Sequence, residues 1–133
     1  MTADDARYAV GVGAGRAADA TEVHELVRAA LADAGIASDQ VDAVATVEDR
    51  LDHPALRGLP WPRVGYRAEE LAAVDVPHPS DRVAAAIGTP SVAEAAALLA
   101  AGPGAAVVVP KRGSDHATVA VARSAGLPPG GTP

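Results

Sequence analysis

The sequence predicts a three-layer α/β/α fold, with a mostly parallel sheet and an antiparallel strand near the C-terminus. Short strand patterns rich in Val and Ala alternate with helical patterns along the chain, which is typical of parallel sheets covered by helices. The last two strand patterns are separated only by a polar turn, and such a turn joins antiparallel strands. The apolar residues, 49% of the chain, are mainly Ala, Val and Leu, which suit closely packed layers.

The first predicted elements are a strand that begins at Tyr8 and a helix that begins near Ala20. The segment YAVGVGAG starts as an apolar strand and ends in glycines. Asp19 and Glu22 have the spacing of a capping box, in which Asp19 accepts from a free helix N–H and Glu22 reaches back. Apolar residues then recur with helical spacing, and Gly35 supplies the left-handed residue that ends the helix.

The middle of the chain predicts two more strands and two short helices. The strands are VDAVATVED at 41–49 and PRVGY at 62–66, and a short turn or helix at 51–59 connects them. The segments at 68–74 and 80–88 have helical patterns. The prolines in the loop DVPHPS exclude one continuous helix there, because proline breaks the helical hydrogen-bond ladder.

The C-terminal part predicts one helix and a strand pair. VAEAAALLAAG forms a helix that ends at Gly102, and the strands at 105–112 and 117–123 follow, joined by the turn GSDH. We expect one domain over residues 8–123. Residues 1–7 and 124–133 are expected to be disordered ends, because their polar or Pro/Gly-rich composition buries too little apolar surface.

Composition excludes several classes of protein. The chain has no cysteine, so it forms no disulfide, thiolate zinc site or cysteine nucleophile. Its net charge of −6 gives no general positive field for nucleic acid, and no apolar run is long enough to predict a membrane span. An acidic N-terminus without a signal-peptide pattern predicts a cytoplasmic protein. Four scattered histidines lack the paired spacing of metal sites, so we expect neither a metal nor a cofactor.

A short polar stretch precedes the C-terminal helix and predicts a binding site. Gly88, Thr89 and Ser91 lie where a loop leads into a helix N-terminus, and free N–H groups there favour anions. The alternative is that both hydroxyls only cap the helix. The glycines of GVGAGRA raise the same question after the first strand. Arg16 stands where a dinucleotide-binding fingerprint requires glycine, which argues against a Rossmann site.

In their order along the chain these motifs resemble the cobalamin biosynthesis CobE/CbiG C-terminal domain family, over about residues 10–123. The likeness is strongest at GTPSVAEAAALL, VPK and ATVAVAR, and looser at VGVG and TVEDRLDHPAL. The resemblance implies a role in corrin-ring biosynthesis, with a precorrin or cobalt-precorrin intermediate or another corrin-pathway enzyme as partner. Longer family members resemble hydrolases that open the lactone of cobalt-precorrin-5A and release acetaldehyde. Such hydrolysis is the enzymatic alternative, and a protein-interaction module without ligand is another.

A precorrin suits a crevice at the carboxyl ends of the strands. Its ring is apolar and carries acetate and propionate groups, which helix N-termini, guanidinium forks and ammonium groups bind. We expect the crevice to be lined by Gly13, Arg16, Thr46, Arg50, Gly88, Thr89, Ser91 and Lys111. The alternative for each basic residue is a solvated surface charge. Glu48 and Asp49 are candidates for a general base. The alternative is that they are solvated residues at the start of a loop or cap a helix.

Overall fold

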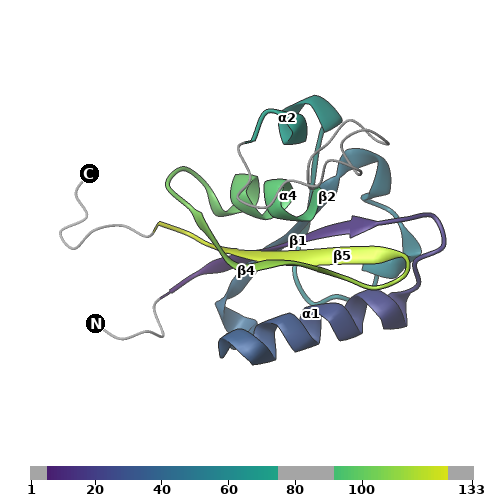
Figure 1. Ribbon diagram of the computed structural model, residues 1–133, viewed down its shortest axis with the longest axis horizontal. Coiled ribbons are helices and arrows are strands. Elements are labelled where there is room, and N and C mark those ends of the chain that lie inside the picture. Colours follow the sequence, from purple (N-terminus) through teal and green to yellow (C-terminus); the bar gives the residue numbers. More distant parts are fainter. Residues whose placement is uncertain (1–5, 75–91, 126–133) are drawn as a thin grey trace.

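A five-stranded sheet between two helical layers forms the core of this protein. The computed structural model describes residues 6–74 and 92–125. Helix α1 covers one face of the sheet, and α4 and α2 cover the other (Figure 1). The strands are β1 (Tyr8–Ala14), β2 (Val41–Val47), β3 (Arg63–Tyr66), β4 (Ala106–Gly113) and β5 (Ala117–Arg123), and the helices are α1 (Ala20–Ala34), α2 (Ala68–Ala72) and α4 (Val92–Ala101). The predicted three-layer fold is confirmed.

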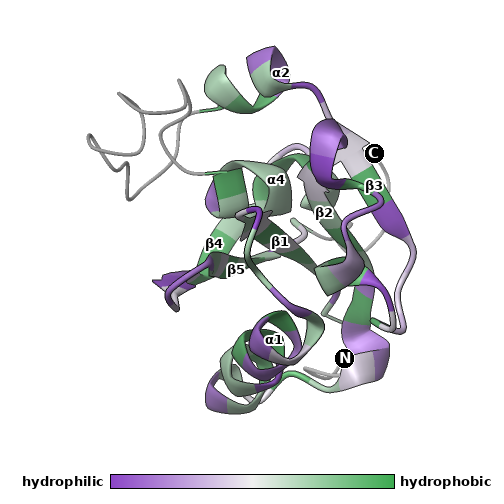
Figure 2. Ribbon diagram, turned by 90° about the vertical axis from the view of Figure 1, so that its right-hand side faces the viewer, coloured by the Kyte–Doolittle hydropathy of each residue, from purple (hydrophilic) through white to green (hydrophobic). Residues whose placement is uncertain are grey.

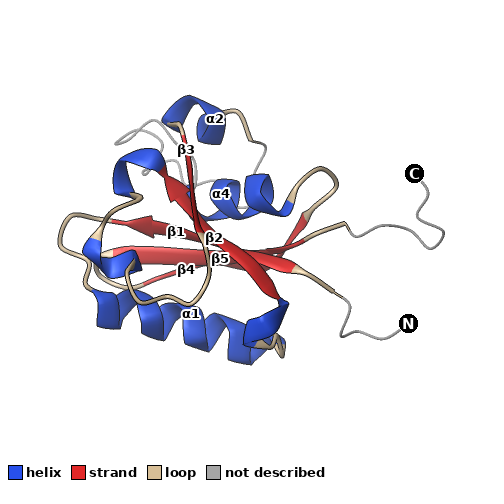
Figure 3. Ribbon diagram, turned by 180° about the vertical axis from the view of Figure 1, so that it is seen from behind, coloured by secondary structure: helices blue, strands red, loops and turns tan. Residues whose placement is uncertain are grey.

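Four strands run in one direction and β5 runs in the other. The strand order is β3-β2-β1-β5-β4. β2 pairs in parallel with β1 and β3, whereas β5 pairs antiparallel with β1 and β4 (Figure 3). This confirms the predicted antiparallel strand near the C-terminus. The carboxyl ends of β1, β2, β3 and β4 therefore share one edge of the sheet.

Helix α1 has the predicted limits and both contacts of the predicted capping box. The Asp19 side chain accepts from the Glu22 N–H at 2.8 Å, and Gly35 ends the helix with a φ of 69°. The buried side chains, Val23 and Val27 among them, face the sheet. The Glu22 carboxylate also interacts with the Asp19 backbone N–H, as the capping box predicts, and in addition it binds the turn between β4 and β5.

Helix α4 lies unusually close to β1. A Cβ atom added to Gly11 would fall 1.9 Å from the Ala93 carbonyl oxygen and 2.7 Å from the Ala97 nitrogen. Small side chains on both surfaces allow this approach, since Ala93 and Ala95–Ala97 are all buried on the same helix. Figure 2 shows the apolar strands enclosed between the two helical layers. The layer on this side is thin because it is built from alanine and glycine.

The remaining predicted elements are confirmed wherever the structure describes them. Segment 51–59 contains a single 3-10 turn, Pro54–Leu56, and the helix that follows Tyr66 is α2. The predicted helix at 80–88 lies outside the described residues. Near the ends, Arg7 forms an ion pair with Asp42.

Two searches over residues 6–74 and 92–125 bear on the class of protein. No helix in these ranges combines the length and the hydropathy that a bilayer crossing requires. The same residues contain no group of three or more histidine, aspartate or glutamate side chains arranged to hold a metal ion.

Candidate functional site

The loops at the shared carboxyl edge form the candidate site, which we call the carboxyl rim. It comprises residues 15–18 after β1, residues 48–53 after β2, Arg67 after β3, and residues 113–116 between β4 and β5. Figure 2 views the molecule from this edge. Since the four parallel strands end here, loops that are distant in sequence lie next to one another.

The loop after β1 is a tight turn that carries Arg16. The Ala18 N–H donates to the Gly15 carbonyl at 3.1 Å, and the Gly15 N–H donates to the His116 carbonyl at 2.8 Å. The turn is therefore fixed against the β4–β5 connection, while Arg16 itself is exposed to solvent. No hydrogen bond or ion pair engages the Arg16 side chain within the described ranges.

The loop after β2 brings Arg50 to the end of β1. Its Nε donates to the Ala14 carbonyl at 2.9 Å, and the side chain is half-buried. The two terminal nitrogens of this guanidinium have no hydrogen bond to any described residue. In Arg50, Nε is therefore held by the protein, whereas the two terminal nitrogens are available to a ligand. The structure brings together Arg16 and Arg50, two of the basic residues expected from the sequence.

Thr46 and Gly13 lie beneath the rim, where each has a structural partner. Thr46 is 1% exposed, and its hydroxyl donates to the Val12 carbonyl at 2.8 Å, which links β2 to β1. A Cβ atom on Gly13 would fall 3.0 Å from the Thr118 hydroxyl and 3.5 Å from the Val92 Cβ. The space above Gly13 is therefore filled by the protein's own side chains. Both residues shape the rim from below, and Thr46 has no exposed surface for a ligand.

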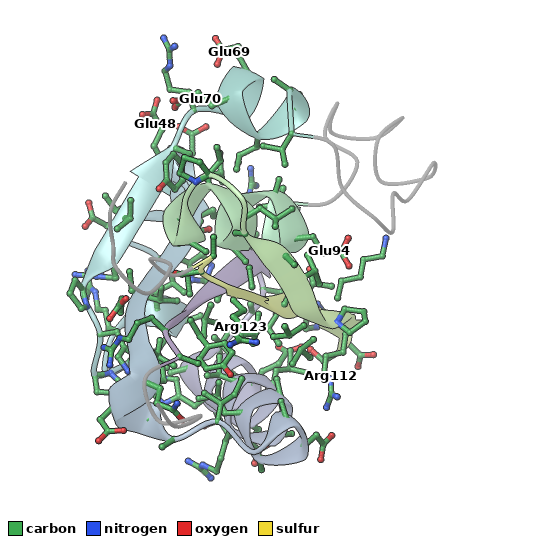
Figure 4. All side chains as sticks on the ribbon, turned by 90° about the vertical axis from the view of Figure 1, so that its left-hand side faces the viewer. Glu48, Glu69, Glu70, Glu94, Arg112 and Arg123 are labelled. Carbon is green, nitrogen blue, oxygen red and sulfur yellow. The ribbon has the colours of Figure 1, made fainter. Side chains whose placement is uncertain are left out.

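Lys111 lies on the edge strand β4, next to the start of α4. Its backbone N–H donates to the Glu94 carboxylate at 2.9 Å, and Glu94 is fully buried. The neighbouring Arg112 forms an ion pair with Asp33 of α1 at 2.7 Å. Figure 4 shows Glu94 beside α4 and Arg112 toward α1, so these two groups lie on different faces of the sheet.

Three expected site residues lie outside the described ranges. Gly88, Thr89 and Ser91 precede Val92, where the description of α4 begins. The anion site expected at this helix start stays a prediction. Arg123, another basic residue at a strand end, pairs in register with Tyr8. It therefore lies at the opposite edge of the sheet and has no part in the rim.

Glu48 and Asp49 occupy a single 3-10 turn, Glu48–Arg50, directly after β2. Both carboxylates are exposed to solvent. Gly65 makes room for this turn, since a Cβ atom there would fall 3.0 Å from the Glu48 Cα. Figure 4 shows Glu48 at the end of the molecule that also carries Glu69 and Glu70. The two candidates for a general base thus have the surroundings of ordinary solvated acids.

Two side chains, those of Glu22 and His53, make contacts at the rim that the sequence does not predict. The Glu22 carboxylate accepts from the Ser114 hydroxyl and from the His116 N–H, the latter at 2.8 Å. These hydrogen bonds hold the pKa of Glu22 below its usual range, and the one from Ser114 contributes most. The His53 ring contacts the Gly15 carbonyl at 2.9 Å. No local signal in the sequence reveals either contact, because 38 or more positions separate the partners.

A groove of about 480 Å³ lies between α1 and the β4–β5 hairpin. Leu26 and Ala29 contribute apolar surface to it, and Glu22 and Arg112 contribute charge. None of the site residues expected from the sequence lines this groove. It lies beside the rim, with which it shares Gly113 and Ser114.

Comparison with known proteins gives consistent matches. The family model for the cobalamin synthesis G C-terminus matches residues 8–122. Protein CobE from Sinorhizobium sp is 39% identical over 124 residues, which cover 89% of this chain and 80% of that protein. A crystal structure of CobE, described as a protein of the cobalamin (vitamin B12) biosynthetic pathway, superposes with a TM-score of 0.80 at 28% identity. This match covers 95% of our chain and 99% of the other.

Two further solved structures extend the comparison. Cobalamin biosynthesis protein chiG from Agrobacterium tumefaciens str. C58 has a TM-score of 0.64 and 33% identity, over 90% of this chain and 99% of its own. A putative cobalamin biosynthesis protein G homolog from Sulfolobus solfataricus has a TM-score of 0.71 at 19% identity, which shows the fold alone. The match covers 91% of this chain but 38% of that longer protein. Because the family model spans nearly all of the domain predicted at 8–123, this chain belongs to the CobE/CbiG C-terminal domain family and is a cobalamin biosynthesis protein.

Proposed function

We propose that this chain is an accessory protein of cobalamin biosynthesis that binds a precorrin-type intermediate through the carboxyl rim. The observation that carries the proposal is the pair Arg16 and Arg50 on adjacent loops. Both guanidinium groups have nitrogens without a hydrogen-bond partner in the described chain. A guanidinium fork binds a carboxylate through two parallel hydrogen bonds, and precorrins carry several carboxylates.

The spacing of the cations supports a ligand of tetrapyrrole size. Lys111 lies on β4, which is two strands away from β1 in the sheet. Neighbouring strands are about 4.8 Å apart, so the strand that carries Lys111 lies about 10 Å from the one that leads to Arg16. That separation is on the scale of a tetrapyrrole ring. A polycarboxylate ring is thus large enough to meet both Arg16 of the rim and Lys111 of β4.

The hydrolase alternative has less support. A general base for lactone opening has to lie within hydrogen-bond reach of the attacking water, and its interactions are strengthened where bulk water is excluded. Glu48 and Asp49 are exposed on a surface turn. We therefore favour binding over hydrolysis. Acetaldehyde released from cobalt-precorrin-5A by the purified protein would reverse this preference.

Isothermal titration calorimetry with uroporphyrin tests the proposal, since uroporphyrin is a tetrapyrrole with acetate and propionate side chains. We expect the unsubstituted protein to bind it and not to bind its methyl ester. Arg16→Ala should weaken binding at least about tenfold, because a charge-assisted hydrogen bond is lost. Arg123→Ala is the matched control, since it removes the same charge from the opposite edge. It should bind like the parent.

Calorimetry is preferable to the fluorescence of the single tryptophan. The Trp61 indole donates to the Ser38 carbonyl at 2.9 Å, just before the start of β2. This contact places it at the edge of the sheet opposite to the carboxyl rim. A ligand on the rim would not touch Trp61. Absence of binding by the parent, or equal weakening by Arg16→Ala and Arg123→Ala, would contradict the proposed function.

A further inference from the structure

We infer that His53 is a positioning residue of the carboxyl rim, which holds the Gly15–Ala18 turn in the conformation that receives a ligand carboxylate. The inference rests on the proposed function, because the turn carries Arg16. It assigns to His53 a role that neither its sequence context nor the family match indicates.

Two successive carbonyl groups at the end of β1 receive side-chain contacts from the loop after β2. The Ala14 carbonyl accepts from the Arg50 Nε at 2.9 Å, and the Gly15 carbonyl lies 2.9 Å from the His53 Nε2. The Gly15 carbonyl also accepts from the Ala18 N–H, which closes the turn. The residues that lead into the turn are thus fixed from one side by residues 50–53 and from the other by His116.

The hydrogen bonds of His53 define its tautomer. Its Nδ1 lies 3.0 Å from the Ala55 backbone nitrogen, which is a donor, so Nδ1 has to accept. A neutral imidazole then carries its proton on Nε2, and this proton points to the Gly15 carbonyl. Both ring nitrogens have partners, which fixes the orientation of the ring. His53 therefore joins the 3-10 turn Pro54–Leu56 to the Gly15–Ala18 turn.

This arrangement leaves hydrogen-bond donors of the turn and of Arg50 without partners in the described ranges. Arg16 and Ala17 are exposed, and their backbone N–H groups have no hydrogen bond to any residue in 6–74 or 92–125. The terminal nitrogens of Arg50 are also free, next to the Ala14 carbonyl. Backbone N–H groups in a turn form concave sites for anions, and guanidinium groups complete such sites. One ligand carboxylate is the chemical group that this set of donors fits.

His53→Asn separates the two contacts of the imidazole. The asparagine oxygen can still accept from the Ala55 N–H, since asparagine is a favoured cap. Its side chain is too short to reach the Gly15 carbonyl. His53→Gln is the matched control, because its amide nitrogen occupies nearly the position of Nε2 and can donate. We expect His53→Asn to bind uroporphyrin about three- to tenfold more weakly than the parent. His53→Gln should remain close to the parent.

A double-mutant cycle with Arg16→Ala distinguishes positioning from a general loss of structure. The turn positions the Arg16 side chain as well as its own backbone N–H groups, so if His53 acts through the turn, His53→Asn should weaken binding by a smaller factor once Arg16 is alanine. A loss by the same factor in both backgrounds would overturn the inference. Equal affinities of His53→Asn and the parent would overturn it as well.

Amide hydrogen exchange gives a readout that needs no ligand. The Gly15 N–H, bonded to the His116 carbonyl, should exchange faster in His53→Asn than in His53→Gln. Unchanged exchange would show that His53 does not hold the turn, and would overturn the inference even if binding changed. Failure of the parent to bind uroporphyrin would instead refute the proposed function, and the ligand-positioning role of His53 with it.

Discussion

Replacing Gly11 with alanine should destabilise this protein, because no side chain fits between β1 and α4 at that position. A Cβ atom would fall 1.9 Å from the Ala93 carbonyl oxygen, 2.7 Å from the Ala97 nitrogen and 2.9 Å from the Ala93 carbonyl carbon. All three are backbone atoms of a helix. The closest contact would have to lengthen from 1.9 Å to 3.4 Å before it became ordinary van der Waals contact.

The size of the effect follows from what has to move. No side chain can rotate away, so α4 itself would have to shift and loosen the packing of its buried alanines. Overpacking a core usually lowers the free energy of unfolding by about 1–3 kcal/mol. A clash with backbone atoms lies at the upper end of this range, so we expect a loss of about 3 kcal/mol. Since domains are stable by only about 5–15 kcal/mol, this loss is a large fraction of the total.

Urea unfolding of Gly11→Ala and the parent measures the loss of unfolding free energy. Gly35→Ala is the control, because it has open space around it and only the strain of a φ of 69°. That strain corresponds to about 1 kcal/mol. If Gly11→Ala were no more destabilising than Gly35→Ala, the close approach of α4 to β1 would be refuted.

Two other substitutions probe the rim from below and from the side. The hydrogen bonds to Glu22 lower its pKa in the folded protein. The ionised carboxylate therefore stabilises the fold at pH values above the pKa of Glu22 in the unfolded chain, about 4.3. This stabilisation is lost as the pH falls through the lower pKa of the folded protein. Glu22→Gln should therefore make unfolding depend less steeply on pH below about 4.3, and an unchanged acid-unfolding curve would contradict this. Thr46→Val removes the buried hydroxyl that donates to the Val12 carbonyl, and should lower stability by about 1–2 kcal/mol in urea unfolding, with Thr46→Ser closer to the parent. Equal stability of Thr46→Val and the parent would show that this hydrogen bond has no net effect.

The secondary structure could be predicted closely because its signals are local. Asp19 caps α1, and Gly35 and Gly102 follow α1 and α4 with positive φ. These residues act on backbone groups a few positions away, so their effect does not depend on the rest of the fold. The hairpin of β4 and β5 was predictable for the same reason, since its connection is short.

The composition of the rim was predictable only in part. The rule that ligands bind at the carboxyl ends of strands pointed to the loops after β1 and β2, and Arg16 and Arg50 are exposed or half-buried there. The same rule included Thr46, which is buried, with its hydroxyl bound to the Val12 carbonyl of β1. Alternation along a strand places a residue on one face or the other, but sequence alone does not identify which contact fills that face.

The sequence by itself determined which segments of this protein become helices and strands, which edge of the sheet carries the basic loops, and which family the chain resembles. Only the tertiary structure decided which side chains are free at that edge. Glu22 binds Ser114, His53 faces the Gly15 carbonyl, and Gly11 receives the backbone of α4. Each of these contacts joins segments that the sheet brings together from distant parts of the chain. Local patterns carry the preferences of the backbone, whereas the partner of a side chain depends on the packing of the whole fold.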